Sequence, residues 1–457
     1  MLGLHNLPKH VKYKETYRPF DYFWGLGVEH ETYIQTSSLK TFKTFEGSMK
    51  PERYSVNYYK AYKEVPLKKS LKSVVPITVP VLLNAYAMTN TDLFGEHATL
   101  YQRGSPPNSR YNGKTLFEWI CEQSSWIEAE YNKSIVFDGD TIEFITQDFY
   151  RATVGKVIQE LEELEARFSL ELSRLPSRGI IADHGPLSLV RSNEPWATYT
   201  TNMSNIAMFN NGTLHINVTL PTRLDWRCRP LWHTDFVEQH RRLARLIQWI
   251  EPIWVALYGS PDPFTEVTQL QDSFAAGSQR LAVSRYIGLG TFDTTLMPTG
   301  KILQIPRTQI PWYDALHEKT DYEPLDVIGL DLNFNKHWAH GLEIRIFDQM
   351  PLTQLREVME TLVGLMDLSL SMKTVEDPRT STVWQRLATE AMYRGSSMSV
   401  EPEMVNAVLR GFNSTYEVKS PLTPTETMKT LILAIQDYRG FCWSHLVEGK
   451  RMSMCPC

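Results

Sequence analysis

The chain has 457 residues, of which 42% are hydrophobic and 22% charged, and its formal net charge is −5. This is the composition of an ordinary globular protein that can bury a large core, and it excludes a disordered chain. No long basic run is present, which argues against a nucleic-acid-binding protein. No run of about 18 apolar residues is present, so we expect no membrane-spanning helix.

The first 20 residues lack the apolar segment of a signal peptide. The five cysteines are scattered, apart from Cys455 and Cys457 in the terminal Cys-Pro-Cys. An odd number of cysteines without a secretion signal is typical of reduced thiols, so we expect a cytoplasmic protein. The terminal pair is compatible with metal binding or a redox couple, although an exposed tail is the commoner role.

The pattern of apolar residues mixes strands and helices up to about residue 350 and is almost wholly helical afterwards. In chain order, we expect a strand at 25–32, a strand at 141–145, a helix at 156–175, a strand at 213–220, a helix at 235–258, strands at 330–334 and 342–348, and helices at 355–372, 382–393, 402–412 and 423–446. The last helix begins with Thr423-Pro-Thr-Glu426, a capping box with proline at the first helical position. We therefore expect an α+β fold, with a catalytic sheet-and-helix domain at 1–350 and a helical part at 351–457 packed on the same domain.

The five predicted strands alternate apolar residues with acidic or short polar ones. Successive side chains of a strand point to opposite faces, so each strand has one apolar face and one polar face. An antiparallel sheet with helices behind it and water in front would carry lysine, threonine, serine and glutamate on the wet face. Lysine is absent here, and the polar positions are Glu29, Glu31, Glu143, His215, Asn217, Asp331, Asn333, Glu343 and Arg345. We interpret this face as a functional site.

Clustered carboxylates favour divalent cations. Glu29 and Glu31 would lie about 6.6 Å apart on one strand face, where two charges repel by about 2.5 kcal/mol at an effective dielectric of 20. Adding Glu143 and Glu343 makes an empty cavity unfavourable, and hard oxygen ligands of this kind suit Mg²⁺ or Mn²⁺. His215 is compatible with Mn²⁺ or with a phosphate.

The other polar residues leave alternatives open. Asn217 can bind a metal or a substrate amide, and Arg345 is either a structural counter-ion or a stabiliser of a transferred phosphate. A zinc site is disfavoured because the sequence has no HExxH motif and no histidine–cysteine cluster with ligand spacing. A P-loop and a dinucleotide-binding glycine fingerprint are also absent.

Four short motifs follow one another in a familiar order. They are Gly27-Val-Glu-His-Glu31, Asp140-Thr-Ile-Glu-Phe-Ile-Thr146, Leu214-His-Ile-Asn-Val-Thr219 and Gly341-Leu-Glu-Ile-Arg-Ile-Phe-Asp348. In this order they resemble the glutamate–cysteine ligase and glutamine synthetase superfamily, including its amidoligases. Tyr258-Gly-Ser-Pro261 and Ser284-Arg285 resemble the serine–proline turn and the later arginine element of these enzymes.

The resemblance implies an antiparallel sheet curled into a half-barrel, with helices on the convex side and ATP with Mg²⁺ on the concave face. By analogy, the metal ligands would be Glu29, Glu31, Glu143, His215 and Glu343. Contacts to ATP would come from His215, Asn217, Asn333 and Arg345. Arg345 would contact the transferred phosphate, and Arg285 would be a second contact to phosphate or to substrate.

Three departures from the family pattern bear on the substrate. About 110 residues separate Glu31 from Glu143, Asn217 replaces a second histidine, and Phe-Ile-Thr-Gln-Asp follows Glu143 instead of a serine–proline turn. The segments 96–111 and 337–340 can shape an acceptor pocket or form surface turns.

The resemblance implies an ATP-dependent ligase that phosphorylates a small-molecule or peptide carboxylate and then joins it to an amine. One alternative is a phosphotransferase of the same fold that acts on a guanidino or hydroxyl group. The other is a non-catalytic relative that binds nucleotide and metal.

Overall fold

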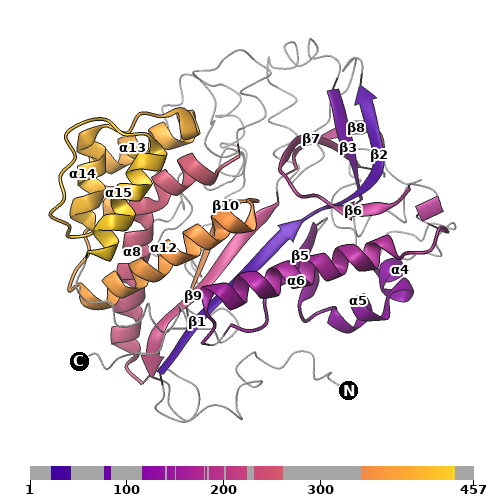
Figure 1. Cartoon of the computed structure of the whole chain (residues 1–457), viewed down its shortest axis with the longest axis horizontal. Helices are drawn as coiled ribbons and strands as arrows, with labels where there is room; N and C mark the ends of the chain where they lie inside the picture. The colour runs from indigo at the N-terminus through magenta and orange to yellow at the C-terminus, as the bar shows by residue number, and fades with distance from the viewer. Residues whose placement is uncertain are drawn as a thin grey trace.

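The computed structural model describes residues 22–42, 77–83, 116–138, 141–149, 151–179, 181–182, 185–199, 202–210, 212–223, 231–260 and 341–437. The fold is α+β, and the described strands form two five-stranded sheets (Figure 1). The first sheet has the order β10-β9-β1-β5-β4, and every neighbouring pair in it is antiparallel. Its strands are β1 (Tyr22–Thr32), β4 (Ile135–Asp138), β5 (Thr141–Ile145), β9 (Thr213–Arg223) and β10 (Leu342–Asp348). Within the described part of the chain, this sheet is open and does not close into a barrel.

The second sheet has the order β6-β2-β3-β7-β8. Its strands are β2 (Ile34–Phe42), β3 (Ile77–Leu83), β6 (Leu187–Leu189), β7 (Glu194–Tyr199) and β8 (Asn202–Asn210). Only Tyr33, which is fully buried, separates β1 from β2, so the chain passes directly from the first sheet into the second. The sequence patterns did not predict this sheet.

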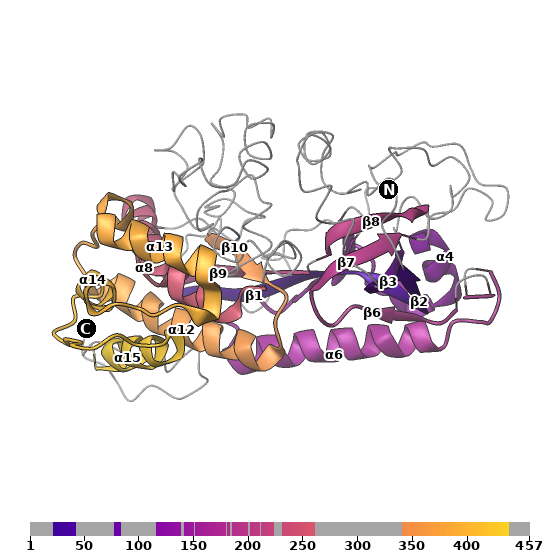
Figure 2. The same cartoon turned by 90° about the horizontal axis from the view of Figure 1, so that it is seen from above.

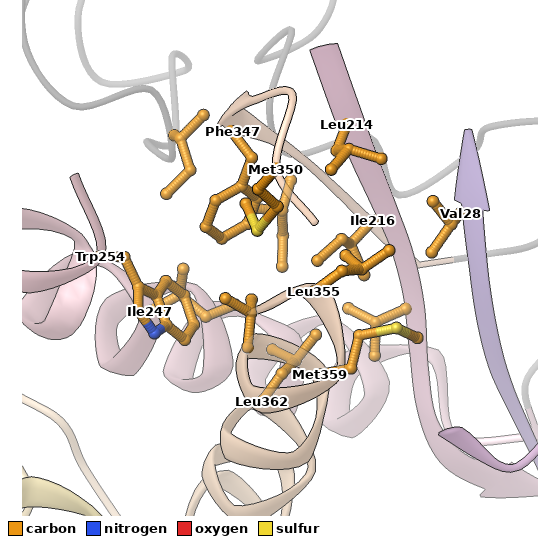
Figure 3. Packing of buried hydrophobic residues seen from close by; sticks show 14 of the residues in the cluster. Val28, Leu214, Ile216, Ile247, Trp254, Phe347, Met350, Leu355, Met359 and Leu362 are labelled. Atoms are coloured by element: carbon orange, nitrogen blue, oxygen red, sulfur yellow. The ribbon is translucent and has the colours of Figure 1, made fainter. Parts of the chain in front are cut away.

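Three long helices cover the apolar face of the first sheet: α6 (Val154–Ser173), α8 (His233–Tyr258) and α12 (Leu352–Ser371). Figure 2 shows α6 and α12 on the same side of β1. The close view in Figure 3 shows side chains from the strands and from both α8 and α12 meeting in one cluster. Its labelled members are Val28, Leu214, Ile216, Ile247, Trp254, Phe347, Met350, Leu355, Met359 and Leu362. Burial of this continuous apolar surface is the main force that holds the sheet to the helices.

The C-terminal helices pack around α8. They are α13 (Thr382–Arg394), α14 (Pro402–Gly411) and α15 (Pro424–Gln436). The buried Trp384 indole N–H donates to the carbonyl of Gln248 in α8 at 2.8 Å. The predicted capping box is confirmed, because the Thr423 hydroxyl accepts from the Glu426 N–H at 3.2 Å and the Glu426 carboxylate accepts from the Thr423 N–H at 2.8 Å. The division of the chain at residue 350 stays a prediction.

The predicted strands at 25–32, 141–145, 213–220 and 342–348 and all six predicted helices are present, with ends that shift by a few residues. One larger difference is α15, which ends at Gln436, while the predicted continuation to residue 446 lies mostly outside the described residues. The predicted strand at 330–334 also lies outside them. Two short helices, α4 (Leu116–Gln123) and α5 (Ser125–Glu130), were not predicted. Among the helices that the structure describes, none is long and apolar enough to cross a membrane.

Candidate metal centre

The register of the first sheet brings its acidic residues onto one face. Glu31 lies opposite Glu143 on β5, and Glu29 lies opposite His215 on β9. Asn217 on β9 lies opposite Glu343 on β10. Directly opposite residues of antiparallel strands share a face. The alternating neighbours, such as Val28 and Ile216, belong to the hydrophobic core, so the acidic face is the one turned away from α6, α8 and α12.

His215 is at the centre of this face. Its Nδ1 lies 3.5 Å from a carboxylate oxygen of Glu29, 3.7 Å from one of Glu31 and 3.6 Å from one of Glu343. The side chains of His215 and Glu343 are almost closed to solvent, with exposed fractions of 1% and 3%, whereas those of Glu29 and Glu31 are 10% and 16% exposed. Three carboxylates from two strands therefore surround one imidazole nitrogen at nearly equal distances.

These donor atoms fit a divalent cation. One ligand atom from each of Glu29, Glu143 and His215 lies within 4.8 Å of the others. Ligands about 2.1 Å from a shared ion lie about 3.0 Å apart when adjacent in an octahedron and about 3.4 Å apart in a tetrahedron. The separations of 3.5–3.7 Å between His215 Nδ1 and the carboxylate oxygens are slightly wider than either value. Carboxylate oxygens with one imidazole suit Mn²⁺ and, with less preference for the nitrogen, Mg²⁺.

The electrostatics of the centre favour the same occupant. The ligand oxygens of Glu29 and Glu143 lie no more than 4.8 Å apart. Two carboxylate charges at that distance repel by about 3 kcal/mol at an effective dielectric of 20. Within the group formed by Glu29, Glu31, Glu143, Glu343, His215 and Arg345, four anionic side chains accompany at most two cationic ones. A bound divalent ion would relieve this repulsion.

Short polar side chains of β9 orient the carboxylates. The Asn217 amide donates to Glu29 at 3.1 Å, and the Thr213 hydroxyl donates to Glu31 at 2.9 Å. The same hydroxyl lies 3.3 Å from Nε2 of His215. Hydrogen bonds of this kind fix the direction of ligands before an ion arrives. In this structure Asn217 is a partner of a carboxylate; its predicted contact with ATP stays a prediction.

Arg345 lies at the edge of the acidic group. Its guanidinium donates to Glu343 at 2.9 Å, and its side chain is 30% exposed. A β-bulge between Ile344 and Phe347 interrupts the pairing of β10 with β9, so Phe347 takes a core position opposite Leu214. The ion pair agrees with the structural counter-ion interpretation, while contact with a transferred phosphate stays a prediction.

The sequence patterns did not identify Phe149 as part of this face. A Cβ atom placed on Gly25 would lie 2.0 Å from the Phe149 ring, and one on Gly27 would lie 2.9 Å from it. Gly25 and Gly27 point to the same face as Glu29 and Glu31, so the buried ring lies against β1 beside the carboxylates. Two glycines at alternate positions of a strand are the signal that could have indicated a close bulky neighbour.

The motif that ends β10 joins this strand to α8. The backbone N–H of Ser260, just after α8, donates to the buried Asp348 carboxylate at 2.8 Å. The Asn193 amide donates to the Ser260 hydroxyl at 2.6 Å. Asp348 and Ser260, which the sequence placed in two separate family-like motifs, are therefore direct partners.

Other predicted site residues lie outside the described part of the chain. These are Arg285 and Asn333, together with Asp331 and the segments 96–111 and 337–340. Their predicted roles stay predictions.

The chain is similar to a viral protein. No family model matches the chain. The chain is 33% identical over 433 residues to the uncharacterized protein R704 of Acanthamoeba polyphaga mimivirus. The matched region is 92% of this chain and 76% of the viral protein.

Proposed function

The chain belongs to the family of the mimivirus protein R704, and we propose that it is an ATP- and metal-dependent carboxylate–amine ligase. The name of the viral relative states no activity, so support for the proposal comes from the geometry of the acidic face. The observation that carries it is the convergence of Glu29, Glu143 and His215 from three different strands.

We propose that Glu29, Glu31, Glu143, Glu343 and His215 hold Mg²⁺ or Mn²⁺. Ions held by these residues would offset the charge of the ATP phosphates. We further propose that the open sheet curls as in the half-barrel of glutamate–cysteine ligases, with this acidic face on its concave side. The cover of α6, α8 and α12 on the opposite face supports this arrangement.

The residues of the chain then have distinct tasks. Glu343 holds the guanidinium of Arg345 beside the acidic group, where its planar donors suit the oxygens of a transferred phosphoryl group. Asn217 and Thr213 keep the carboxylates directed at the centre. In the proposed reaction the γ-phosphoryl of ATP moves to a substrate carboxylate, and an amine then displaces phosphate from the acyl phosphate. Arg285 and Asn333 are proposed as further contacts to the phosphates.

The substrates are proposed as a small-molecule or peptide carboxylate and an amine. This pair distinguishes the ligase from the two alternatives. A guanidino or hydroxyl phosphotransferase would form ADP and a phosphorylated product without an amide. A non-catalytic relative would bind nucleotide and metal without forming ADP.

The decisive experiment supplies ATP, Mn²⁺ or Mg²⁺ and a panel of amino acids and amines, and follows ADP release together with the mass of the product. We expect ADP and an amide-linked product in equal amounts. Replacing Glu29 or Glu343 by glutamine keeps the side-chain shape but removes a ligand charge, so turnover should fall by about 100-fold.

Glu171→Gln is a matched control. Glu171 is a buried carboxylate of α6, which packs on the apolar face of the sheet, and it accepts from Ser124 at 2.7 Å and from Arg167 at 2.9 Å. This variant should keep its turnover. Normal turnover in both Glu29→Gln and Glu343→Gln would reject the assignment of the site.

A further inference from the structure

A buried histidine lies directly behind the acidic face. His30 stands between Glu29 and Glu31 on β1, and it points to the core face because strand side chains alternate. Its Nδ1 lies 2.5 Å from a carboxylate oxygen of Glu165 on α6. The exposed fractions of the two side chains are 6% and 5%. This contact therefore joins the strand that carries two proposed metal ligands to the helix behind it.

Glu165 is also held in place by Arg191, which lies at the protein surface. Its second oxygen accepts from the guanidinium of Arg191, which also donates to the Ser169 hydroxyl at 3.0 Å. Burial alone raises the pKa of the Glu165 carboxyl, but the hydrogen bond from His30 and the charges of His30 and Arg191 hold the pKa below its ordinary value. Glu165 is therefore ionised near neutral pH and fixed in direction by partners on two sides.

The other ring nitrogen of His30 contributes no second anchor. Nε2 is buried and, within the described part of the chain, it has no hydrogen-bond partner. The ring lies 6.4 Å from the Phe144 ring, measured between centroids. Among the described residues, Glu165 is therefore the hydrogen-bond partner that the imidazole ring has.

Stability alone gives little reason for this pair. A buried polar pair can often be replaced by apolar side chains of similar volume without loss of stability, because the cost of desolvating its groups offsets most of their attraction. The neighbouring core positions of β1 are Leu26 and Val28, which are simply apolar. What the pair adds over two apolar residues is a directional hydrogen bond, which fixes the ring atom that faces Glu165.

The orientation of the His30 side chain is coupled, through the strand, to the orientation of Glu29 and Glu31. The backbone of His30 is paired with Phe144 on β5 and with Leu214 on β9. A rotation of β1 about its own axis at this point would swing Glu29 and Glu31 together, since both side chains are one residue away on the opposite face. A fixed imidazole resists that rotation.

We propose that His30, anchored by Glu165, is a positioning residue that keeps Glu29 and Glu31 directed at His215 for divalent-metal binding. The inference rests on the proposed metal centre. It assigns His30 no contact with metal or substrate, and it predicts that the loss of the pair weakens metal binding even where the fold is intact.

The test is direct Mn²⁺ binding without nucleotide, measured by calorimetry on the full chain, alongside the melting temperature. In His30→Leu/Glu165→Leu both partners become apolar, so no unpaired charge is buried and the melting temperature should stay near that of the wild type. Mn²⁺ affinity should nevertheless fall by about 10-fold or more. Glu171→Gln is the control, because it removes another buried α6 carboxylate contact and should leave the Mn²⁺ affinity unchanged.

If the double variant does not fold, two single variants test the positioning role of His30. The amide nitrogen of asparagine can occupy the place of Nδ1, whereas that of glutamine lies nearer the place of Nε2. His30→Asn should therefore retain Mn²⁺ affinity and His30→Gln should lose it. Wild-type affinity in the double variant, or equal affinity in the two single variants, would overturn the positioning role. A wild-type chain that binds no Mn²⁺ would instead overturn the proposed metal centre.

Discussion

The two faces of β1 are held by different forces. On one face, Leu26 and Val28 are buried in a hydrophobic cluster that extends into α6, α8 and α12. On the other, Glu29 and Glu31 accept hydrogen bonds from Asn217 and Thr213, respectively. The first face stabilises the fold through many interchangeable contacts, whereas the second gathers repelling charges through a few specific ones. Stability and proposed function are thus separated between alternate residues of one strand.

Neighbouring residues of β9 offer the largest test of this difference. Ile216 is fully buried on the core face, and Asn217 is next to it on the acidic face. Ile216→Ala should lower the free energy of unfolding by about 3 kcal/mol, through lost burial and the cavity left behind. Asn217→Ala removes one partly buried hydrogen bond and should lower it by about 1 kcal/mol or less. Urea denaturation measures both.

The same pair should show the reverse order in Mn²⁺ binding. Asn217→Ala frees the Glu29 carboxylate to turn and should weaken binding by about 10-fold, whereas Ile216→Ala should leave it nearly unchanged while the protein is folded. Equal losses of stability in the two variants would show that the faces do not divide these tasks. An unchanged denaturant slope is needed for the comparison to hold.

The alternation of acidic and apolar residues between the two faces also made the acidic face predictable from sequence. Alternation is a local property, and Thr213, His215 and Asn217 share a face whatever strand lies beside them. The capping box of Thr423 and Glu426 is equally local and was predicted in full. Pairing between strands is not local. The predicted alternation at Leu342, Ile344 and Ile346 therefore did not reveal the bulge that turns Phe347 into the core.

The second sheet and Phe149 were missed for the same physical reason. Phe149 lies against Gly25 and Gly27 across more than 120 residues of sequence, and no local pattern encodes that contact. The strands of the second sheet gave no alternation strong enough to predict them, although β1 continues into β2 after Tyr33 alone. The hydrogen-bond partner of His30 was missed because Glu165 looks, in sequence, like any charged residue of an amphipathic helix.

The glycines of β1 give a second test, of intermediate size. A methyl group on Gly25 would lie 2.0 Å from the Phe149 ring, which must then move. Gly25→Ala should therefore lower the free energy of unfolding by about 2 kcal/mol. Gly27→Ala, with a 2.9 Å approach, should lower it less. Thermal or urea denaturation of both variants measures the difference.

Phe149→Leu supplies the control for this clash. Shortening the side chain makes room for the new methyl group, so Gly25→Ala should cost less in the Phe149→Leu background than in the wild type. Additive effects would mean that the ring does not restrict Gly25. A non-additive cycle would identify Phe149 as the reason for glycine on a face otherwise occupied by carboxylates.

The smallest expected effect tests whether the acidic face opposes folding without metal. Glu143→Gln removes one charge from the group around His215, where the ligand oxygens of Glu143 and Glu29 lie within 4.8 Å. In the presence of a chelator this variant should be more stable than the wild type by about 1 kcal/mol. That value is below the Coulomb estimate because Glu143 is partly exposed. Glu162→Gln, an exposed change on α6, should have almost no effect.

In saturating Mn²⁺, by contrast, Glu143→Gln should be less stable than the wild type. An ion present at 100 times its dissociation constant stabilises the folded state by about 2.7 kcal/mol, and the weaker ligand set of Glu143→Gln should receive less of that gain. Urea denaturation with chelator and with Mn²⁺ therefore distinguishes two kinds of acidic residue. Removing a structural carboxylate would lower the stability of the protein under both conditions. Removing a metal ligand would raise the stability with chelator and lower it with Mn²⁺.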